Sequence, residues 1–350
     1  MQFDLVEDGA SPWDSKHPVL EILRQRRATN SRPGSRADGD TAKVGLAVEG
    51  GGMRGVVSAA MLAALEDRGF GYAFDAVYGC SSGSINSAYF LAGGTWYPVS
   101  IYYDDLTTRR FISFTRAFRG GNVLDLDYAF GEVVEIIKPL NYDRVLASPV
   151  RLHIAITDVE GISTRLISDF TDRADLKAAL LASSWLPIAV RGTATFRGWR
   201  ALDGGVVTAL PFRLALLDDC THVLSLSTRP MRPSAGRLSV QHHYTHRYLE
   251  RIKKGLGSAY LESVRQRHRD QLDLAVRRGG HHPPPYVLDL APLPEDTEVK
   301  RHELRSHLLI SAARRAYSLM YCAVEGRPVA LLREGRLHSV PRLTVVDPCP

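Results

Sequence analysis

Short apolar runs alternate with helical stretches through the first half of the chain. Residues 44–48 form an apolar run with the length of a buried parallel strand. Residues 56–69 follow with helical periodicity and end in a glycine. A second run at residues 74–78 leads into another helical stretch at residues 84–93. This order of strand, helix, strand and helix predicts an α/β domain whose mainly parallel central sheet is flanked by helices.

The pattern also divides the rest of the chain. Residues 95–150 have the pattern of helices and loops, which indicates a cap-like insertion over one face. Strands are expected at residues 151–157, 164–167 and 221–227, and a helix at residues 176–183. Residues 240–278 and 299–323 are long amphipathic stretches, separated by a Pro-rich segment. We therefore expect one domain over residues 43–325, a polar arm at 1–42 with one short helix within 17–27, and a tail at 326–350.

Composition excludes several classes of protein. Of the 350 residues, 45% are hydrophobic and 23% are charged, as in an ordinary globular protein with a substantial core. No apolar run is long enough to span a bilayer, and the N-terminus has no apolar signal region. The four cysteines are scattered, which indicates free thiols in a reducing compartment. These features predict a cytoplasmic protein.

The net charge of +6 is compatible with an anionic partner. Arg and Lys residues are spread along the chain without a dense basic tail or a nucleic-acid fold signature, so we expect no nucleic-acid partner. If residues 242–278 form one helix, its basic residues lie opposite an apolar side. Peripheral contact with a membrane surface is one interpretation of this stretch, but an ordinary surface helix packed on the sheet is favoured.

A nucleophile motif lies between the second strand and the helix after it. Gly79, Cys80, Ser81, Ser82 and Gly83 have the spacing G-x-S-x-G. A nucleophile at a sharp strand-to-helix turn needs small neighbours, because the turn must close and leave the hydroxyl exposed. The N-terminus of the helix would direct N–H groups and a positive dipole end at an oxyanion. This context makes Ser81 the candidate nucleophile.

A glycine-rich loop follows the first strand. Gly50, Gly51 and Gly52 stand in a row, and Arg54 and Gly55 follow after one residue. Their uncovered amides could bind a phosphate or the oxyanion of a tetrahedral intermediate. The loop also fits the dinucleotide fingerprint G-x-G-x-x-G, but the acidic residue that this fingerprint needs at the end of the second strand is missing. A nucleotide site is therefore kept only as an alternative.

A third motif consists of Asp203, Gly204 and Gly205. Alone, such a sequence is often just a hairpin turn, so its functional interpretation depends on the other two motifs. None of the 12 histidines has a sequence context that favours a Ser-His-Asp triad. His242 and His246 are spaced i,i+4, but a third zinc ligand is missing. We expect neither a metal nor another cofactor.

Together and in this order, the three motifs resemble the patatin-like phospholipase family. Thr157-Asp158 after a strand and the segment A-S-S-W-L-P at residues 182–187 are similar to further family segments. The resemblance covers residues 43–230 well and the C-terminal third only loosely. Family members commonly carry Asn shortly before the Pro that follows the DGG, whereas this chain has Ala209 there. The resemblance implies the patatin-like three-layer α/β fold.

The resemblance also implies a serine–aspartate dyad that cleaves carboxylic esters of lipids or phospholipids. Ser81 would form an acyl-enzyme, Asp203 would accept its proton, and N–H groups of the loop from Gly50 to Gly55 would bind the oxyanion. Such an Asp is a weak base unless burial and closeness to Ser81 raise its basicity. Two alternatives stay open: transfer of the acyl group to another alcohol instead of water, and a non-catalytic regulator that keeps the fold. The oligomeric state is not predicted.

Overall fold

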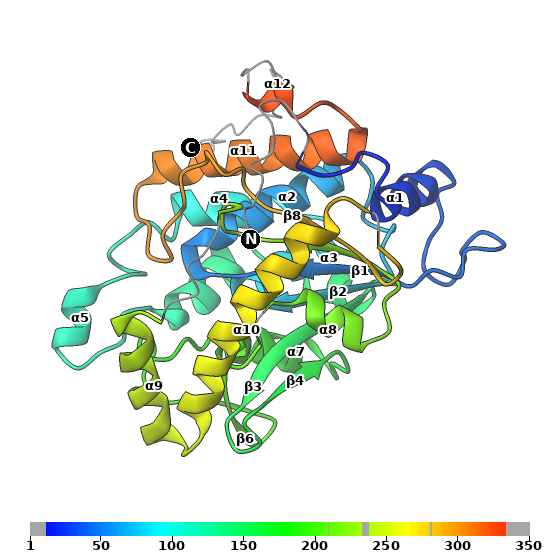
Figure 1. Cartoon of the computed structure of the whole chain (residues 1–350). Coiled ribbons are helices and arrows are strands. Elements are labelled where there is room, and N and C mark those ends of the chain that lie inside the picture. Colours follow the sequence, from blue (N-terminus) through cyan, green and yellow to red (C-terminus); the bar gives the residue numbers. More distant parts are fainter. Residues whose placement is uncertain (1–11, 209, 233–237, 281, 334–350) are drawn as a thin grey trace, which may run out of the picture.

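The structure is a computed structural model that describes residues 12–208, 210–232, 238–280 and 282–333. Its centre is an eight-stranded sheet (Figure 1). The strands are β1 (Val44–Val48), β2 (Ala76–Cys80), β3 (Arg151–Asp158), β4 (Ser163–Ile167), β5 (Ala194–Phe196), β6 (Trp199–Asp203), β7 (His222–Leu226) and β8 (Tyr286–Leu290).

Hydrogen bonding connects the strands along the path β5-β6-β3-β2-β1-β7-β8, and β4 pairs with β3 outside this path. The five strands from β3 to β8 along this path are parallel. The strands β4 and β6 run antiparallel to β3, and β5 runs antiparallel to β6. The prediction of a mainly parallel sheet is therefore confirmed.

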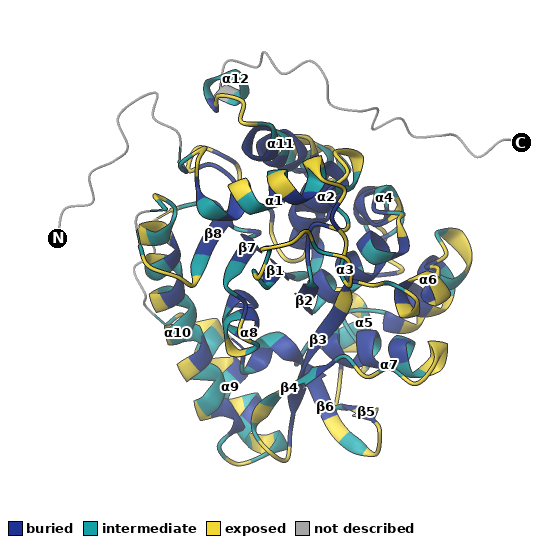
Figure 2. Cartoon of the chain, turned by 90° about the vertical axis from the view of Figure 1, so that its right-hand side faces the viewer, coloured by how far each residue is buried: buried dark blue, intermediate teal, exposed yellow. Residues whose placement is uncertain are grey.

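Helices cover both faces of this sheet (Figures 1 and 2). Two short 3-10 helices, η1 (Gly52–Arg54) and η3 (Gly204–Val206), and a π-helix, η2 (Tyr128–Ile137), complete the regular structure. The α-helices are α1 (Pro18–Ala28), α2 (Gly55–Asp67), α3 (Ser82–Ala92), α4 (Trp96–Asp104), α5 (Phe114–Phe118), α6 (Tyr142–Leu146), α7 (Arg173–Ser183), α8 (Phe212–Leu217), α9 (Val240–Ile252), α10 (Leu256–Arg277), α11 (Ser306–Glu325) and α12 (Ala330–Arg333).

Alternation along the central strand separates two apolar cores. Successive strand residues point to opposite faces, and β1 is buried on both. Leu46 and Val48 belong to a large core that includes α2, α3 and α11. Ala47 belongs to a smaller core with Phe212 of α8 and Leu274 of α10. The sheet is thus the middle of three layers, as the family resemblance implies.

Several elements differ from the expectations. The stretch 240–278 forms two helices, α9 and α10, because the chain turns at Gly255, which has a φ of 93°. The helix expected at residues 299–323 is α11, which begins at Ser306, so residues 299–305 are not helical. The strands β5, β6 and β8 were not expected, and β6 contains Asp203. Asp203 therefore ends a strand and does not form a hairpin turn.

Residues 12–42 pack against the domain. The helix expected within 17–27 is α1, and its Val19, Leu20 and Leu23 side chains are buried. Arg26 is also buried and forms ion pairs with Asp40 and Asp75, both at 2.8 Å. The described part of the predicted polar arm is therefore held on the domain. The boundary at residue 42 stays a prediction, and residues 1–11 and 334–350 of the predicted arm and tail lie outside the described residues.

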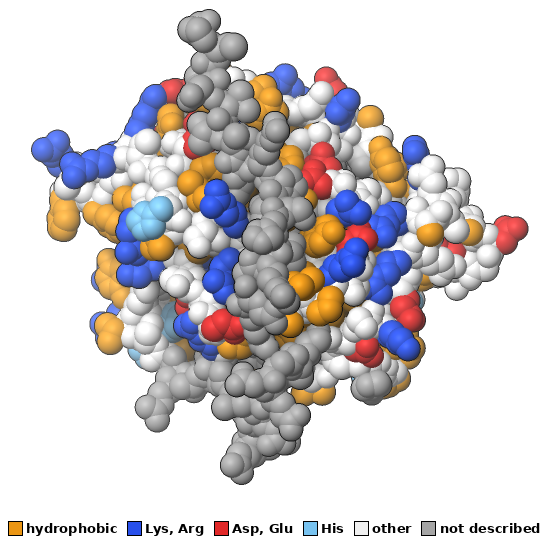
Figure 3. All heavy atoms as spheres, turned by 90° about the horizontal axis from the view of Figure 1, so that it is seen from above, with side chains coloured by type: hydrophobic (Ala, Val, Ile, Leu, Met, Phe, Trp, Pro, Cys, Tyr) orange, Lys and Arg blue, Asp and Glu red, His pale blue; other side chains and the backbone are white. Residues whose placement is uncertain are grey.

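The described surface carries mixed charge. On the face above α11, Lys and Arg side chains are interspersed with acidic and hydrophobic ones wherever the surface is visible (Figure 3). Leu249 of α9 and Leu256 of α10 are buried against Leu202 and Val206, so this apolar side packs on the domain. Contact of α9 and α10 with a membrane stays a prediction. None of the helices in the described ranges combines the length and apolar character needed to cross a bilayer.

Candidate active site

Ser81 occupies the sharp turn between β2 and α3. Its φ of 56° and ψ of −134° are unusual for a residue with a side chain, and such strain is typical of functional turns. The flanking glycines permit the turn. A Cβ atom on Gly79 would lie 2.6 Å from the Ser84 Cα, and one on Gly83 would lie 2.3 Å from the Val48 carbonyl oxygen. The G-x-S-x-G spacing therefore has a steric basis in this fold.

A buried serine anchors this turn. Ser183, at the end of α7, accepts a hydrogen bond from the Ser81 N–H at 3.0 Å and donates one to the Ala155 carbonyl oxygen at 2.8 Å. Ser183 belongs to the A-S-S-W-L-P segment that the sequence singled out. Its hydroxyl thus connects the elbow to strand β3.

The register of the sheet brings Asp203 next to the elbow. Ala155 pairs with Cys80 of β2, and the following residue, Ile156, pairs with Asp203 of β6. Both residues also pair with β4, so β2 and β6 must lie on the same side of β3. Asp203 therefore comes directly after the end of β2 along this edge. The Thr157 hydroxyl donates to the Asp203 carbonyl oxygen at 2.9 Å and holds this strand end.

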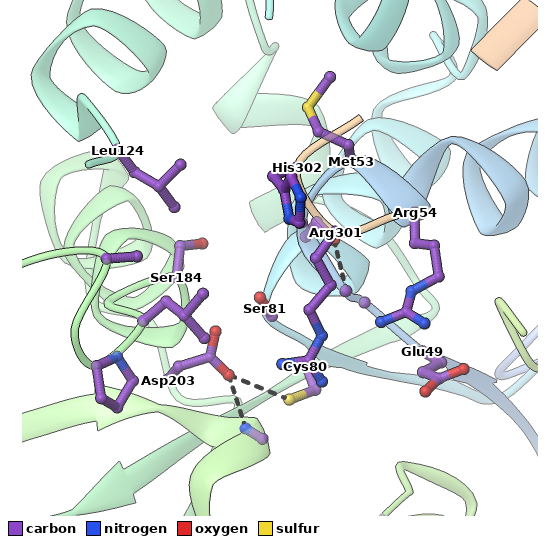
Figure 4. Close-up of a pocket in the computed structure, with 18 of the residues that line it drawn as sticks. Glu49, Met53, Arg54, Cys80, Ser81, Leu124, Ser184, Asp203, Arg301 and His302 are labelled. Atoms are coloured by element: carbon purple, nitrogen blue, oxygen red, sulfur yellow. Dashed lines mark hydrogen bonds between the residues drawn. The ribbon is translucent and has the colours of Figure 1, made fainter. Parts of the chain in front are cut away.

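The Asp203 carboxylate is buried, with only 2% of the residue exposed. Its Oδ1 accepts the Gly205 N–H at 2.8 Å, whereas Oδ2 has no hydrogen-bond partner among the described residues. Burial raises the pKa of Asp203, and the nearby Ser81 hydroxyl and the Gly205 N–H offset this only in part. Figure 4 shows Ser81 and Asp203 facing the same pocket with no labelled side chain between them.

The glycine loop packs directly against the elbow. A Cβ atom on Gly50 would lie 2.3 Å from the Cys80 carbonyl oxygen and 2.9 Å from the Ser81 Cβ. The Gly51 N–H donates to the Ser82 hydroxyl at 3.1 Å. The N–H groups of Arg54 and Gly55 bond back to carbonyl oxygens of residues 51–53. Within the described ranges, the N–H groups of Gly50 and Gly52 have no acceptor.

Ser81 and Asp203 open into a cavity of about 680 Å³, a size within the range of small-molecule sites. One side of this cavity is apolar and is formed largely by residues 95–150, the segment interpreted as a cap. Its lining side chains include Pro98, Ile101, Phe111, Leu126, Phe130 and Val133.

The other side of the cavity is charged. Glu49 is buried and accepts the Arg267 guanidinium at 2.7 Å, and its second oxygen accepts the N–H and hydroxyl of Thr228. Burial acts to raise the pKa of Glu49, but Arg267 and Arg229 outweigh it, so the pKa lies below its usual value. Burial, Arg229 and Arg301 together lower the pKa of Arg54 to about 9.

Arg54 was expected in the glycine loop, whereas Arg229, Arg267 and Arg301 were missed from the sequence. Arg229 lies three residues past β7, at the carboxyl end of a parallel strand, where ligands of α/β sheets bind. That position was a usable signal. Arg267 and Arg301 lie on a long helix and on an irregular segment, and only the fold brings them to this cavity.

The histidines lie apart from the dyad. His242, His268 and His302 line the cavity, but no hydrogen bond or ion pair joins a histidine to Ser81 or Asp203 in the described part of the chain. His242 instead caps the start of α9. A search of the described residues found no group of three or more His, Cys, Asp or Glu side chains that could hold a metal ion. Ala209 lies outside the described residues.

Comparison with known proteins places part of the chain in one family. The family model for patatin-like phospholipase matches residues 46–216, a range that contains the glycine loop, Ser81 and Asp203. This part of the chain is a patatin-like phospholipase domain. The mixed α/β architecture with helices on both faces of the sheet is consistent with the patatin fold.

Two relatives illustrate how far the similarity extends. The chain is 25% identical over 225 residues to the uncharacterized protein YjjU of Escherichia coli K12. The aligned region covers 63% of this chain and 59% of that protein. The chain is also 42% identical over 62 residues to human patatin-like phospholipase domain-containing protein 4. This aligned region covers 17% of this chain and 24% of that protein. The chain thus spans less than two thirds of either relative.

Proposed function

We propose that this chain hydrolyses carboxylic esters of lipids through a dyad of Ser81 and Asp203. The observation that carries this proposal is the register of the sheet, which sets the buried Asp203 beside the elbow that holds Ser81. The strained backbone of Ser81 exposes its hydroxyl to the cavity. The unpartnered Oδ2 of Asp203 is free to accept the hydroxyl proton.

The reaction follows from these positions. Ser81 Oγ attacks the ester carbonyl carbon while Asp203 accepts its proton, which gives a tetrahedral intermediate with a negative oxygen. The protonated Asp203 then donates to the leaving alcohol as the ester bond breaks, and an acyl-enzyme remains. Water attacks the acyl-enzyme and gives a proton to Asp203, which passes it to Ser81 Oγ as the bond between Oγ and the acyl carbon breaks and the carboxylic acid is released. Burial of Asp203 makes its carboxylate a stronger base than an exposed one, so the dyad can work without histidine.

The oxyanion would be stabilised by backbone N–H groups. Gly50 and Gly52 are the loop residues whose N–H groups lack an acceptor in the described structure. Helix α3 begins directly after Ser81, so its first N–H groups and its dipole also favour negative charge at this point. The N–H groups of Gly51, Arg54 and Gly55 support the loop instead.

A fluorophosphonate probe and purified protein test this proposal. We expect the probe to modify Ser81, and Ser81→Ala and Asp203→Asn each to reduce ester hydrolysis by about 10³-fold or more, because both residues act as one unit. His302→Ala serves as the control, because His302 lines the cavity but is bonded to neither residue of the dyad. Modification of Ser82 or Ser84, or loss of activity in the histidine variant, would refute the proposed dyad.

A further inference from the structure

The cavity carries an excess of positive charge. Its described lining contains five basic side chains and three acidic ones. With all of them ionised, two positive charges remain without a counterpart. The basic residues are Arg54, Arg229, Arg267, Lys300 and Arg301, and the acidic ones are Glu49, Asp203 and Glu298.

Hydrogen bonds show which cations lack a partner. Arg267 bonds to Glu49 at 2.7 Å, and Arg54 bonds to Glu298 at 2.7 Å. The side chains of Arg229, Lys300 and Arg301 make no hydrogen bond or ion pair with any described residue. Lys300 and Arg301 are exposed to solvent, whereas the Arg229 Nε is buried without an acceptor. A guanidinium group has five donors and no acceptor, so burying the Arg229 Nε without an anion is unfavourable, and the exposed Arg301 adds positive charge beside it. The site therefore favours an anionic ligand group.

These two arginines are held beside the glycine loop. Thr228, next to Arg229, donates its hydroxyl to Glu49, and the same hydroxyl oxygen lies 3.1 Å from the Gly50 carbonyl oxygen. The Arg301 carbonyl oxygen accepts the Met53 N–H at 3.1 Å. Figure 4 shows the Arg301 side chain extending into the pocket between Ser81 and Glu49. Backbone and hydroxyl contacts thus hold the segments that carry both cations against the glycine loop.

We propose that Arg229 and Arg301 form a subsite for a phosphate group carried by the alcohol half of the substrate. This proposal rests on the proposed ester hydrolysis and specifies its substrate class. The apolar side formed by residues 95–150 takes the acyl chain, so the alcohol half lies toward the arginines. Guanidinium groups bind phosphate oxygens in pairs and suit phosphate better than a point charge does. The preferred substrate is accordingly an acylglycerol phosphate.

The arginines have one effect that does not depend on a phosphate ligand. Positive charge on Arg301 and Arg267 lowers the pKa of Asp203 against the larger effect of burial. Removing Arg301 would therefore also change the hydrolysis of esters that carry no phosphate. Only a change in the preference between esters with and without phosphate reports on the subsite.

A matched pair of substrates provides this measurement. Oleoylglycerol and oleoylglycerol phosphate differ only in the phosphate, and both can be presented in neutral detergent micelles. We expect the parent protein to have a higher kcat/KM for the phosphate ester. Arg229→Gln and Arg301→Gln should each lower this preference by about 10-fold, the value of one charge-assisted hydrogen bond that is partly open to solvent. Arg314→Gln is the control, because Arg314 is exposed on α11 and does not line the cavity.

Inorganic phosphate separates the subsite from a general attraction to the lipid. It should inhibit hydrolysis of neutral p-nitrophenyl butyrate competitively in the parent and in Arg314→Gln, but weakly in Arg229→Gln and Arg301→Gln. Equal kcat/KM for the two oleoyl esters in the parent would overturn the proposal, as would an unchanged preference in both arginine variants. Preference for the phosphate ester without inhibition by phosphate would also overturn this subsite. If no ester is hydrolysed while phosphate still binds to Ser81→Ala by calorimetry, the proposed hydrolysis fails and the anion subsite stands.

Discussion

Replacing Ser183 with alanine should impair the nucleophile without touching the substrate. Ser183 is fully buried, and its hydroxyl accepts the Ser81 N–H and donates to the Ala155 carbonyl oxygen. Since the Ser183 hydrogen is used on Ala155, the Ser84 hydroxyl at 3.1 Å must be the donor in its contact with Ser183. The substitution therefore removes three interactions from one point behind the elbow.

The magnitude follows from the groups that lose a partner. A buried donor or acceptor without a partner costs about 1–3 kcal/mol. Ser81 is only partly buried, so water can replace part of its lost bond. We expect the free energy of unfolding to fall by about 2–4 kcal/mol, which most domains of this stability tolerate. Because the turn at Ser81 loses its anchor, we expect kcat to fall about 10- to 100-fold with little change in KM.

Urea unfolding and the rate of labelling by a fluorophosphonate measure these two effects. Ser87→Ala is the matched control, since Ser87 is also fully buried and its hydroxyl bonds only to the Gly83 carbonyl oxygen of its own helix at 2.7 Å. The control should lose some stability but retain the labelling rate of the folded parent. If Ser183→Ala and Ser87→Ala were labelled equally fast, Ser183 would be a packing residue and the anchoring role would be refuted.

Three further predictions follow from buried groups. Burial raises the pKa of Asp203 in the folded state, so the folded protein favours the protonated carboxyl. The stability that this group contributes is fully present below its unfolded pKa and is lost as pH rises through its folded pKa. Asp203→Asn should therefore gain stability over the parent as pH increases, as urea unfolding at pH 4 and pH 8 would show, although it loses hydrolysis. Gly50→Ala places a Cβ 2.3 Å from the Cys80 carbonyl oxygen and should lower kcat about 100-fold, whereas Gly71→Ala, which meets no atom within 4 Å, should leave kcat unchanged. Arg26→Gln leaves Asp40 buried without its partner and should cost about 3–5 kcal/mol in urea unfolding, whereas Arg32→Gln on the surface should cost almost nothing.

The strands that carry the elbow and the glycine loop were predictable because their signals are local. An apolar run followed by small residues and a helical pattern identifies a buried strand and its turn, as at β1 and β2. The strand β6 was missed because it begins with Trp199 and Arg200 at a partly exposed end and so lacks a continuous apolar run. The break between α9 and α10 was missed because a single glycine at residue 255 interrupts an otherwise continuous amphipathic pattern.

The charged half of the cavity needed the three-dimensional fold. Arg267 lies 218 residues from Glu49 in sequence, and no periodicity along the chain indicates that they meet. The same is true of the link between Ser183 and Ser81, which joins residues 102 positions apart. Sequence motifs therefore identify the groups that are proposed to react. The residues that hold them in place and set their charge became visible only through contacts between distant segments.

The two halves of the cavity act on the same carboxylate. Asp203 is made more basic by burial, and the positive charges of Arg301 and Arg267 work against this effect. Because Arg267 already bonds to Glu49, Arg301 is the cation that a bound phosphate would neutralise. A phosphate-bearing ester would thus raise the pKa of Asp203 in the enzyme–substrate complex and make it a stronger base. The acid limb of kcat against pH should lie at higher pH for oleoylglycerol phosphate than for oleoylglycerol, and Arg301→Gln should remove this difference. Identical acid limbs for both esters in the parent would show that Arg301 and the dyad act independently.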